Sequence, residues 1–148
     1  MSPSAHEQIR NLLSRYCECV DSGDSAALAE LLADAELATL EGYVWGRGRE
    51  GVLKAWWPQL HQYDGVPRTQ HVTANPIIDV DDGAGVATCR SSYVVFQSTQ
   101  DLVLSPIVTG TYHDSFARAA DGSWHFTERR YGVSLVGDLS HHMRGRIG

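Results

Sequence analysis

The second half of the sequence constrains the fold most, because it holds four long β-type segments joined by short turns. Segments rich in β-branched and aromatic residues run from residue 70 onward: QHVTANPIIDV, GVATCRSSYVVFQ, LVLSPIVTGTYHDSFAR and SWHFTERRYGVSLV. Asp82-Gly83 and Asp121-Gly122 are typical of tight turns. Strands joined this way pair antiparallel, and a sheet of long strands coils. Pro76 and Pro106 fall inside strand segments, so each predicts a bulge or a sheet edge.

The first third of the sequence is helical. Its apolar positions follow the spacing of one helical face and predict a helix from about Ser4 to Val20: Ile9, Leu12, Leu13, Tyr16 and Val20. A second short helix, SAALAELLAD, follows, with Asp24 or Ser25 placed to cap its N-terminus.

The segment between the helices and the long strands predicts two further elements. AELATL is a short extended piece, and a glycine-rich connection leads from it to a third helix over roughly Arg49 to Gln59. Pro58 ends this helix, because proline cannot continue the backbone hydrogen bonding. Helices in one block and strands in the next predict an α+β domain. We expect N-terminal helices packed on a strongly curved, mostly antiparallel sheet that forms a cone with a pocket at its mouth.

Composition excludes several classes of partner. The chain has 148 residues, one domain by length, and its 12 basic and 18 acidic residues give a net charge of −6. Nucleic acids and anionic membranes attract clustered Lys and Arg, so neither is an expected partner. The sequence has no apolar run of about 20 residues and no signal-peptide core, which predicts a soluble, cytoplasmic protein.

Cysteines and histidines do not form a metal-binding pattern. Cys17, Cys19 and Cys89 are an odd set without a framework spacing and are expected to be unpaired thiols. The histidines in SHHMRG lack acidic or thiol companions and are expected to belong to an exposed tail. We therefore expect neither a metal nor a cofactor.

Asp21 is unusual because it comes at the end of the first helix, directly after the apolar face. A carboxylate there faces the negative end of the helix dipole, which disfavours its charge by roughly 0.3–1 kcal/mol. Two interpretations remain open. Asp21 could begin an Asx-turn before the second helix, with its side chain bonding backbone amides, or it could be placed there for a functional role.

The sequence resembles the SnoaL-like branch of the nuclear-transport-factor-2-like superfamily. The resemblance rests on the run Y-x-x-x-x-D-x-x-D and on QHVTANP, GTYHDSFAR and DGSWHFTERR. It covers about residues 5–135 of a single domain, leaves residues 136–148 as a tail, and implies a cystatin-like α+β barrel. Within this branch the sequence is similar to scytalone dehydratase, bile acid 7α-dehydratase and hexachlorocyclohexane dehydrochlorinase.

The resemblance implies a set of catalytic residues. Asp21 orients His71, Tyr16 and Tyr43 donate hydrogen bonds to a developing oxyanion or a departing hydroxide, and an arginine late in the last strand stabilises negative charge. This arginine corresponds to Arg129. Simple alternation from the buried Trp124 would select Arg130 instead, and a bulge near Glu128 would reverse that choice.

The resemblance implies a cofactor-independent lyase of the dehydratase type, with His71 as the base that removes a proton from carbon. The substrate would be a small hydrophobic cyclic molecule with a polar handle, within walls formed by Trp45, Trp56, Trp57, Phe96 and Leu102. An isomerase or polyketide cyclase would use the same His–Asp pair. Two non-catalytic alternatives are a ligand-binding domain and a domain like the β-subunit of an aromatic-ring dioxygenase, which would need a largely filled cone.

Two features bear on assembly and on access to the cone. The apolar segments SSYVVFQ and LVLSPIVTGTY predict a sheet face too apolar for solvent, and therefore a homo-oligomer, either a trimer or a dimer. The C-terminal GDLSHHMRGRIG could cover the cone mouth or remain disordered, and whether Glu41 or His113 enters the pocket depends on strand register.

Overall fold

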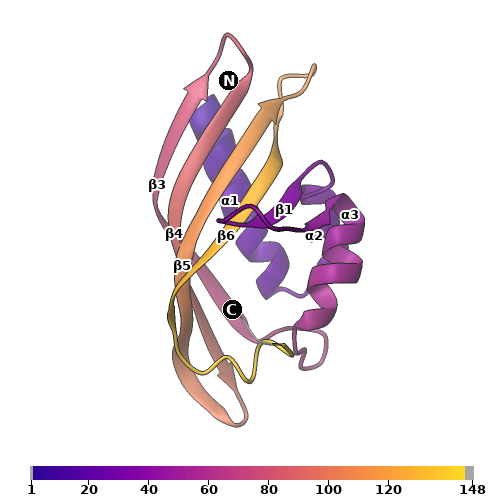
Figure 1. Cartoon of the computed structure of the whole chain (residues 1–148), viewed down its shortest axis with the longest axis vertical. Helices are drawn as coiled ribbons and strands as arrows, with labels where there is room; N and C mark the ends of the chain where they lie inside the picture. Colours follow the sequence, from indigo (N-terminus) through magenta and orange to yellow (C-terminus); the bar gives the residue numbers. More distant parts are fainter. Residues whose placement is uncertain (1, 146–148) are drawn as a thin grey trace.

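The computed structural model describes residues 2–145, which form helices followed by long strands (Figure 1). The helices are α1 (Ala5–Asp21), α2 (Ser25–Leu31) and α3 (Gly48–Glu50), and α3 continues into a π-helical turn (Gly51–Trp56) and a 3₁₀ turn (Trp57–Gln59). The strands are β1 (Glu36–Thr39), β2 (Val44–Arg47), β3 (Thr69–Asp81), β4 (Val86–Thr99), β5 (Leu102–Arg118) and β6 (Trp124–Val136). No helix within residues 2–145 is long and apolar enough to cross a membrane.

The six strands form one curved sheet in the order β2-β1-β6-β5-β4-β3. The β1–β6 pair is parallel and all other neighbours are antiparallel. The sheet does not close, because β2 and β3 remain as its edges. Figure 1 shows the helices on one side of the sheet, with α1 lying along the long strands. The predicted α+β architecture is therefore confirmed, as an open curved sheet.

The core lies between α1 and the sheet. All five residues of the predicted apolar face of α1 are buried: Ile9, Leu12, Leu13, Tyr16 and Val20. The predicted cap of α2 is also confirmed, because the Asp24 side chain accepts a hydrogen bond of 2.9 Å from the main-chain N–H of Ala27. Outside this core, β3, β5 and β6 expose large apolar side chains that include Ile77, Val103 and Leu135. All three cysteines are free thiols, as expected.

Three of the irregularities in strand pairing bear on the predicted bulges and on the orientation of Arg129. The β3–β4 pairing shifts between Ala74 and Ile77, beside Pro76, and the β4–β5 pairing shifts between Val95 and Phe96, which lies opposite Pro106. Both prolines thus mark bulges, as predicted. The third irregularity lies in β6, where Ser115 pairs with Glu128 and Phe116 with Phe126, so that Thr127 is an extra residue.

The bulge at Thr127 decides which arginine points inward. Strand side chains alternate between faces, so an inserted residue exchanges the two faces for everything after it. Trp124 and Phe126 are buried before the bulge, and Arg129 is fully buried after it, whereas Arg130 is only half-buried. Arg129 is therefore the inward-facing member of the doublet.

The segment between β1 and β3 differs from the prediction in two ways. The glycine-rich connection contains a strand, β2, which pairs with β1 after a tight turn. The predicted third helix is not regular, because its middle is a π-helical turn, and Pro58 lies within the final 3₁₀ turn. Gly46 and Gly51 explain this local geometry: a Cβ added to Gly46 would lie 2.8 Å from Gly51 Cα, so the two backbones approach too closely for side chains.

Candidate active site

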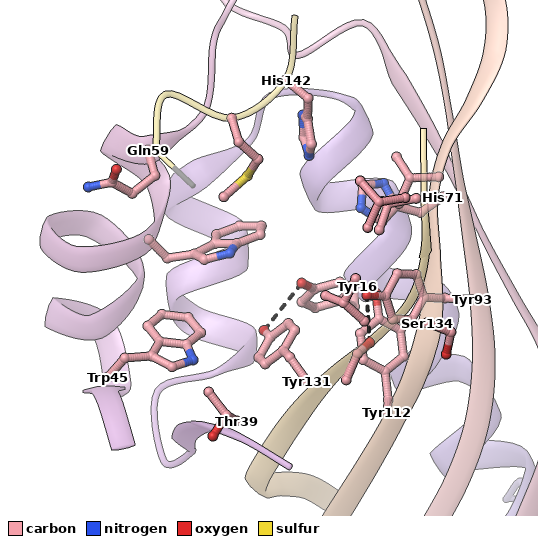
Figure 2. A pocket seen from close by; sticks show the side chains of 18 of the residues that line it. Tyr16, Thr39, Trp45, Gln59, His71, Tyr93, Tyr112, Tyr131, Ser134 and His142 are labelled. Carbon is pink, nitrogen blue, oxygen red and sulfur yellow. Dashed lines mark hydrogen bonds between the residues drawn. The ribbon is translucent and has the colours of Figure 1, made fainter. Parts of the chain in front are cut away.

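A cavity of about 790 Å³ lies between the helices, the sheet and the C-terminal segment (Figure 2). Its lining is mostly apolar and aromatic, and Figure 2 shows Trp45 on the side opposite His71. Four polar side chains line it: Tyr16 from α1, His71 from β3, Tyr131 from β6 and His142 from the C-terminal segment. An apolar cavity with a few convergent polar groups is the usual form of a small-molecule site.

Asp21 and His71 are in direct contact. Asp21 Oδ1 lies 2.6 Å from His71 Nδ1, and Asp21 Oδ2 accepts a hydrogen bond of 2.8 Å from the main-chain N–H of His71. Thr69 Oγ1 donates a third hydrogen bond, of 2.9 Å, to Asp21 Oδ1. The His71 side chain is 5% exposed and that of Asp21 is 21% exposed. Asp21 therefore ends α1 but binds the start of β3, and it does not serve merely as a turn residue.

This geometry selects one tautomer of His71. A carboxylate only accepts hydrogen bonds, so the ring nitrogen facing Asp21 carries the proton. The other nitrogen, Nε2, then keeps its lone pair and can act as a base. Since His71 also lines the cavity, a ligand there meets a histidine whose tautomer and orientation are held by Asp21.

Two tyrosines form a hydrogen-bonded pair at the cavity. The hydroxyl oxygens of Tyr16 and Tyr131 lie 3.2 Å apart, and the ring centroids of Tyr16 and His71 lie 6.3 Å apart (Figure 2). Burial raises the pKa of Tyr16 well above its usual value, and it raises the pKa of Tyr131 to about 12. Both phenols are therefore protonated at neutral pH. One hydroxyl donates to the other, which leaves one O–H of the pair to donate to a ligand oxygen.

Arg129 lies beneath this site and does not line the cavity. Its Nε and Nη2 donate hydrogen bonds of 2.8 and 3.1 Å to the two carboxylate oxygens of Asp114, and neither side chain is exposed. Its guanidinium carbon lies 4.1 Å from the ring centroid of Tyr16 and 3.6 Å from that of Tyr112. Arg129 was expected to stabilise negative charge on the substrate, but it is fully buried and does not line the cavity, so it has no direct contact with a ligand there.

Tyr43 is also not part of the site. It lies in the turn between β1 and β2, is 72% exposed, and its main-chain N–H binds Thr39 Oγ1. The β1–β2 turn therefore directs the Tyr43 ring away from the sheet. Tyr131 occupies the position expected for the second tyrosine, since its hydroxyl meets that of Tyr16.

Only two of the five predicted wall residues line the cavity, namely Trp45 and Trp56. Phe96 lies on the opposite face of β4, because its neighbour Val95 points into the cavity and side chains alternate along a strand. Leu102 pairs with Thr99 next to the β4–β5 turn, away from the site.

Of the three other residues considered for the cavity, one lines it and two do not. Trp57, the fifth predicted wall residue, packs against the core instead of the cavity. Glu41 lines the cavity, whereas His113 is exposed. Trp57 and His113 thus contribute no side chain to a ligand site.

His142 contradicts the prediction of an exposed tail. Its exposed fraction is 5%, and together with Met143 and Gly145 it lines the cavity. The described part of the tail therefore covers the cone mouth, while residues 146–148 lie outside the described residues. Tyr93 and Tyr112 are further lining residues that the prediction omitted. Inward alternation along β4 and β5 was their only sequence signal, whereas no local signal pointed to His142.

Within residues 2–145, no group of three or more His, Cys, Asp or Glu side chains could hold a metal ion. The side chains gathered at the cavity are a histidine held by a carboxylate and a hydrogen-bonded pair of tyrosines.

The open curved sheet, the helices on one face and the enclosed cavity define the class of protein: an α+β protein with a cystatin-like fold. The sequence matches the model of the SnoaL-like domain over residues 2–130, so the chain belongs to the SnoaL-like family of the NTF2-like superfamily.

Solved structures with the same fold include proteins of several kinds. A protein of unknown function from Mycobacterium tuberculosis is 26% identical, with a TM-score of 0.69 over 87% of this chain and 71% of that chain. A scytalone dehydratase candidate from Novosphingobium aromaticivorans is 21% identical, with a TM-score of 0.68 over 90% and 86%. A hexachlorocyclohexane dehydrochlorinase is 18% identical, with a TM-score of 0.67 over 90% and 87%. No curated protein matches the sequence.

Proposed function

We propose that this protein is a cofactor-independent lyase of the dehydratase type, acting on a small hydrophobic cyclic substrate with a polar handle. The observation that carries the proposal is the 2.6 Å contact between Asp21 and His71 at the edge of an apolar cavity. A histidine with a held tautomer and an otherwise apolar surrounding is suited to removing a proton from carbon.

The proposed reaction begins at His71. Its Nε2 takes a proton from a carbon beside an activating group, and Asp21 stabilises the positive charge that develops on the ring. In the Tyr16–Tyr131 pair one hydroxyl donates to the other, and the remaining O–H donates a hydrogen bond to the oxyanion that forms on the substrate. A positioned base contributes about 10²–10⁴-fold in rate, and an oxyanion donor about 10²–10³-fold, so these groups suffice for a modest elimination.

Arg129 has an indirect role in this scheme. Its guanidinium packs against the faces of Tyr16 and Tyr112 and is paired with Asp114, so it orients the tyrosines without touching the substrate. It is thus a positioning residue. The buried ion pair keeps the guanidinium in one place, which fixes the ring that carries the Tyr16 hydroxyl.

Two structures of the same fold are described as eliminating enzymes, a dehydratase candidate and a dehydrochlorinase. At 21% and 18% identity the likeness concerns the fold. Because one fold can host several reactions, an elimination reaction in this protein is our proposal. Elimination of water and elimination of chloride both include the removal of a proton from carbon.

An isomerase or cyclase is the second candidate, because the same base and oxyanion donors would move a proton without loss of a group. A non-catalytic ligand-binding domain would use the cavity without proton transfer. The β-subunit alternative is disfavoured, since a largely filled cone would leave no room for the cavity of about 790 Å³.

The test is a panel of cyclic ketones with a hydroxyl or halide on the β-carbon, incubated with the protein and followed by the absorbance of the enone product. We expect turnover by the wild-type protein and none above background by His71→Gln. Proton transfer without loss of a group would favour the isomerase, and binding without proton transfer would favour the binding domain.

We also propose that copies of the chain associate through the outer sheet face. Val72 and Leu135 are 41% and 71% exposed. They lie in one row across the same face of the sheet, because Val72 pairs with Val94, Val94 with Thr109 and Thr109 with Leu135. Exposed apolar side chains aligned on one face are typical of an interface. Light scattering of the purified protein would give the mass of a dimer or trimer, and a monomer would contradict the proposal.

A further inference from the structure

His142 is a second histidine at the cavity, and the proposed reaction does not use it. Figure 2 shows its ring extending from the C-terminal segment into the cavity. The ring centroids of His142 and His71 lie 6.4 Å apart. The residue is 5% exposed, and among residues 2–145 its Nδ1 has no hydrogen-bond partner. Buried polar atoms are nearly always paired, so this nitrogen needs an explanation.

The segment that carries His142 is held in place by its backbone. The main-chain N–H of His61 donates a hydrogen bond of 2.8 Å to the carbonyl of His142, and that of Arg144 donates one of 2.7 Å to the carbonyl of Gln59. The carbonyl of His141 accepts hydrogen bonds of 2.6 Å from the Tyr63 hydroxyl and 3.0 Å from Gln97 Nε2. The His142 ring is therefore presented from an anchored segment.

Four polar side chains line one side of the cavity in a row. Tyr131 contacts Tyr16, the Tyr16 ring lies 6.3 Å from that of His71, and the His71 ring lies 6.4 Å from that of His142. The proposed base therefore stands between two hydrogen-bonding positions. A ligand held at the base can present one oxygen to the tyrosines and a second oxygen to His142.

The charge state of His142 suits hydrogen bonding to a neutral oxygen. Burial lowers the pKa of His142 to about 4, and the neighbouring His71 acts in the same direction. The ring is thus neutral at neutral pH, with one N–H donor and one nitrogen acceptor. A neutral imidazole can bond a hydroxyl without adding a second positive charge beside His71.

We infer that His142 is a specificity-determining residue that hydrogen-bonds a second oxygen of the substrate, and that the substrate class is a cyclic β-hydroxy ketone. This inference rests on the proposed function, since it takes His71 as the base. In such a molecule the acidic carbon lies between the carbonyl and the carbon that bears the hydroxyl. The order of its groups therefore matches the row: carbonyl at the tyrosines, acidic carbon at His71, hydroxyl at His142.

The reaction then balances without any further reactant. His71 Nε2 takes the proton from the carbon, and the electron pair of that C–H bond forms an enolate whose oxygen accepts a hydrogen bond from the free O–H of the Tyr16–Tyr131 pair. The enolate collapses to the carbonyl, a C=C bond forms, and the C–O bond to the hydroxyl breaks. The departing hydroxide takes the proton from the His71 imidazolium and leaves as water. His142 bonds the hydroxyl oxygen throughout and gives up no proton.

The test compares two probes that differ by one hydroxyl, 1-indanone and 3-hydroxy-1-indanone. We expect the wild-type protein to bind the hydroxy ketone about three- to tenfold more tightly, the worth of one hydrogen bond. His142→Phe keeps a ring but removes both nitrogens, so it should bind the two ketones equally. His142→Gln restores a donor and an acceptor and should recover part of the preference. His141→Phe is the matched control, because the His141 side chain faces Asp138 and not the cavity.

Isotope-labelled imidazole NMR adds a readout that does not depend on affinity. The ring nitrogens of His142 should shift on addition of 3-hydroxy-1-indanone and not on addition of 1-indanone. A preference that survives in His142→Phe, equal binding of both ketones to the wild type, or no binding of either would overturn the inference. Failure of the proposed function looks different: the hydroxyl preference would remain, but no indenone would form.

Discussion

Asp21 binds His71 at two points, the ring nitrogen Nδ1 at 2.6 Å and the main-chain N–H at 2.8 Å. The carboxylate thereby joins the end of α1 to the start of β3. Asp21 and Thr69, which also share a hydrogen bond, are 48 residues apart in the sequence. The main-chain contact fixes where the strand begins, and the ring contact fixes the tautomer. One side chain therefore serves both the fold and the proposed chemistry.

Asp21→Asn should separate these two contributions. An amide keeps one acceptor oxygen, but its NH₂ group can donate to Nδ1 and favour the wrong tautomer of His71. We expect kcat to fall by roughly 10²–10⁴-fold, comparable to losing the base. Asp24→Asn is the matched control, because asparagine caps a helix as well as aspartate and Asp24 caps α2. Equal rates for the two variants would show that Asp21 is only structural.

Tyr16→Phe should reduce turnover with little change in fold. The change removes one donor from the proposed oxyanion site, and we expect a loss of about 10²–10³-fold in kcat. Tyr43→Phe should leave the rate within twofold of wild type, because Tyr43 is 72% exposed and outside the cavity. Steady-state kinetics of both variants checks the assignment; a larger effect at Tyr43 would restore the original prediction for that residue.

Arg129→Met should destabilise the protein strongly. It leaves the Asp114 carboxylate buried without its partner, which costs about 3–5 kcal/mol of the free energy of unfolding. Arg130→Met is the control, since its pair with Glu128 is 37% and 27% exposed, and such pairs contribute about 0–1 kcal/mol. Urea unfolding measures both. Similar losses for the two variants would contradict the structural role assigned to Arg129.

Acid should loosen the C-terminal segment through His142. Burial lowers its pKa from 6.5 to about 4, with His71 and His61 acting in the same direction and Asp21 opposing. Between these pH values the folded state thus binds fewer protons than the state in which the C-terminal segment is detached. Packing of the segment over the cavity is therefore most favourable above about pH 6.5. It weakens as the pH falls, by up to about 3 kcal/mol.

The amide signal of His61 reports this docking, because it donates to the carbonyl of His142. Below pH 6.5 the wild-type signal should move towards its undocked position. In His142→Phe the pH-dependent shift of the His61 amide signal should lose the contribution that comes from protonation of His142. An identical pH dependence in the two proteins would show that another group controls the segment.

Much of the fold followed from local sequence patterns. The apolar spacing in α1, the alternation in β3–β6 and the turn pairs at residues 82–83 and 121–122 are local signals, and each appears in the structure as expected. The position of Asp21 at the end of an apolar helix marked it as unusual, but its pairing with His71 was implied by the family resemblance. The additional contact of Asp21 with the backbone of His71 depends on packing and has no sequence signature.

The parts that could not be predicted depend on long-range geometry. The resemblance selected Arg129, but strand alternation alone selects Arg130, because the residue inserted at Thr127 exchanges the inner and outer faces of β6. Tyr43 was assigned by its distance along the chain, but a tight turn directs it outward. His142 lies outside any periodic apolar pattern. Its segment is held by backbone hydrogen bonds that it forms with Gln59 and His61, about 80 positions earlier.

Hydrogen exchange at carbon tests the central claim, that His71 removes a proton from a carbon acid, most directly. 1-Indanone in deuterated water would be followed by proton NMR at the carbon next to its carbonyl, with wild-type protein, His71→Gln and buffer alone. We predict that the wild type accelerates loss of this proton signal and that His71→Gln reacts no faster than buffer. Exchange at the same rate in all three samples, or equal acceleration by His71→Gln, would contradict the account.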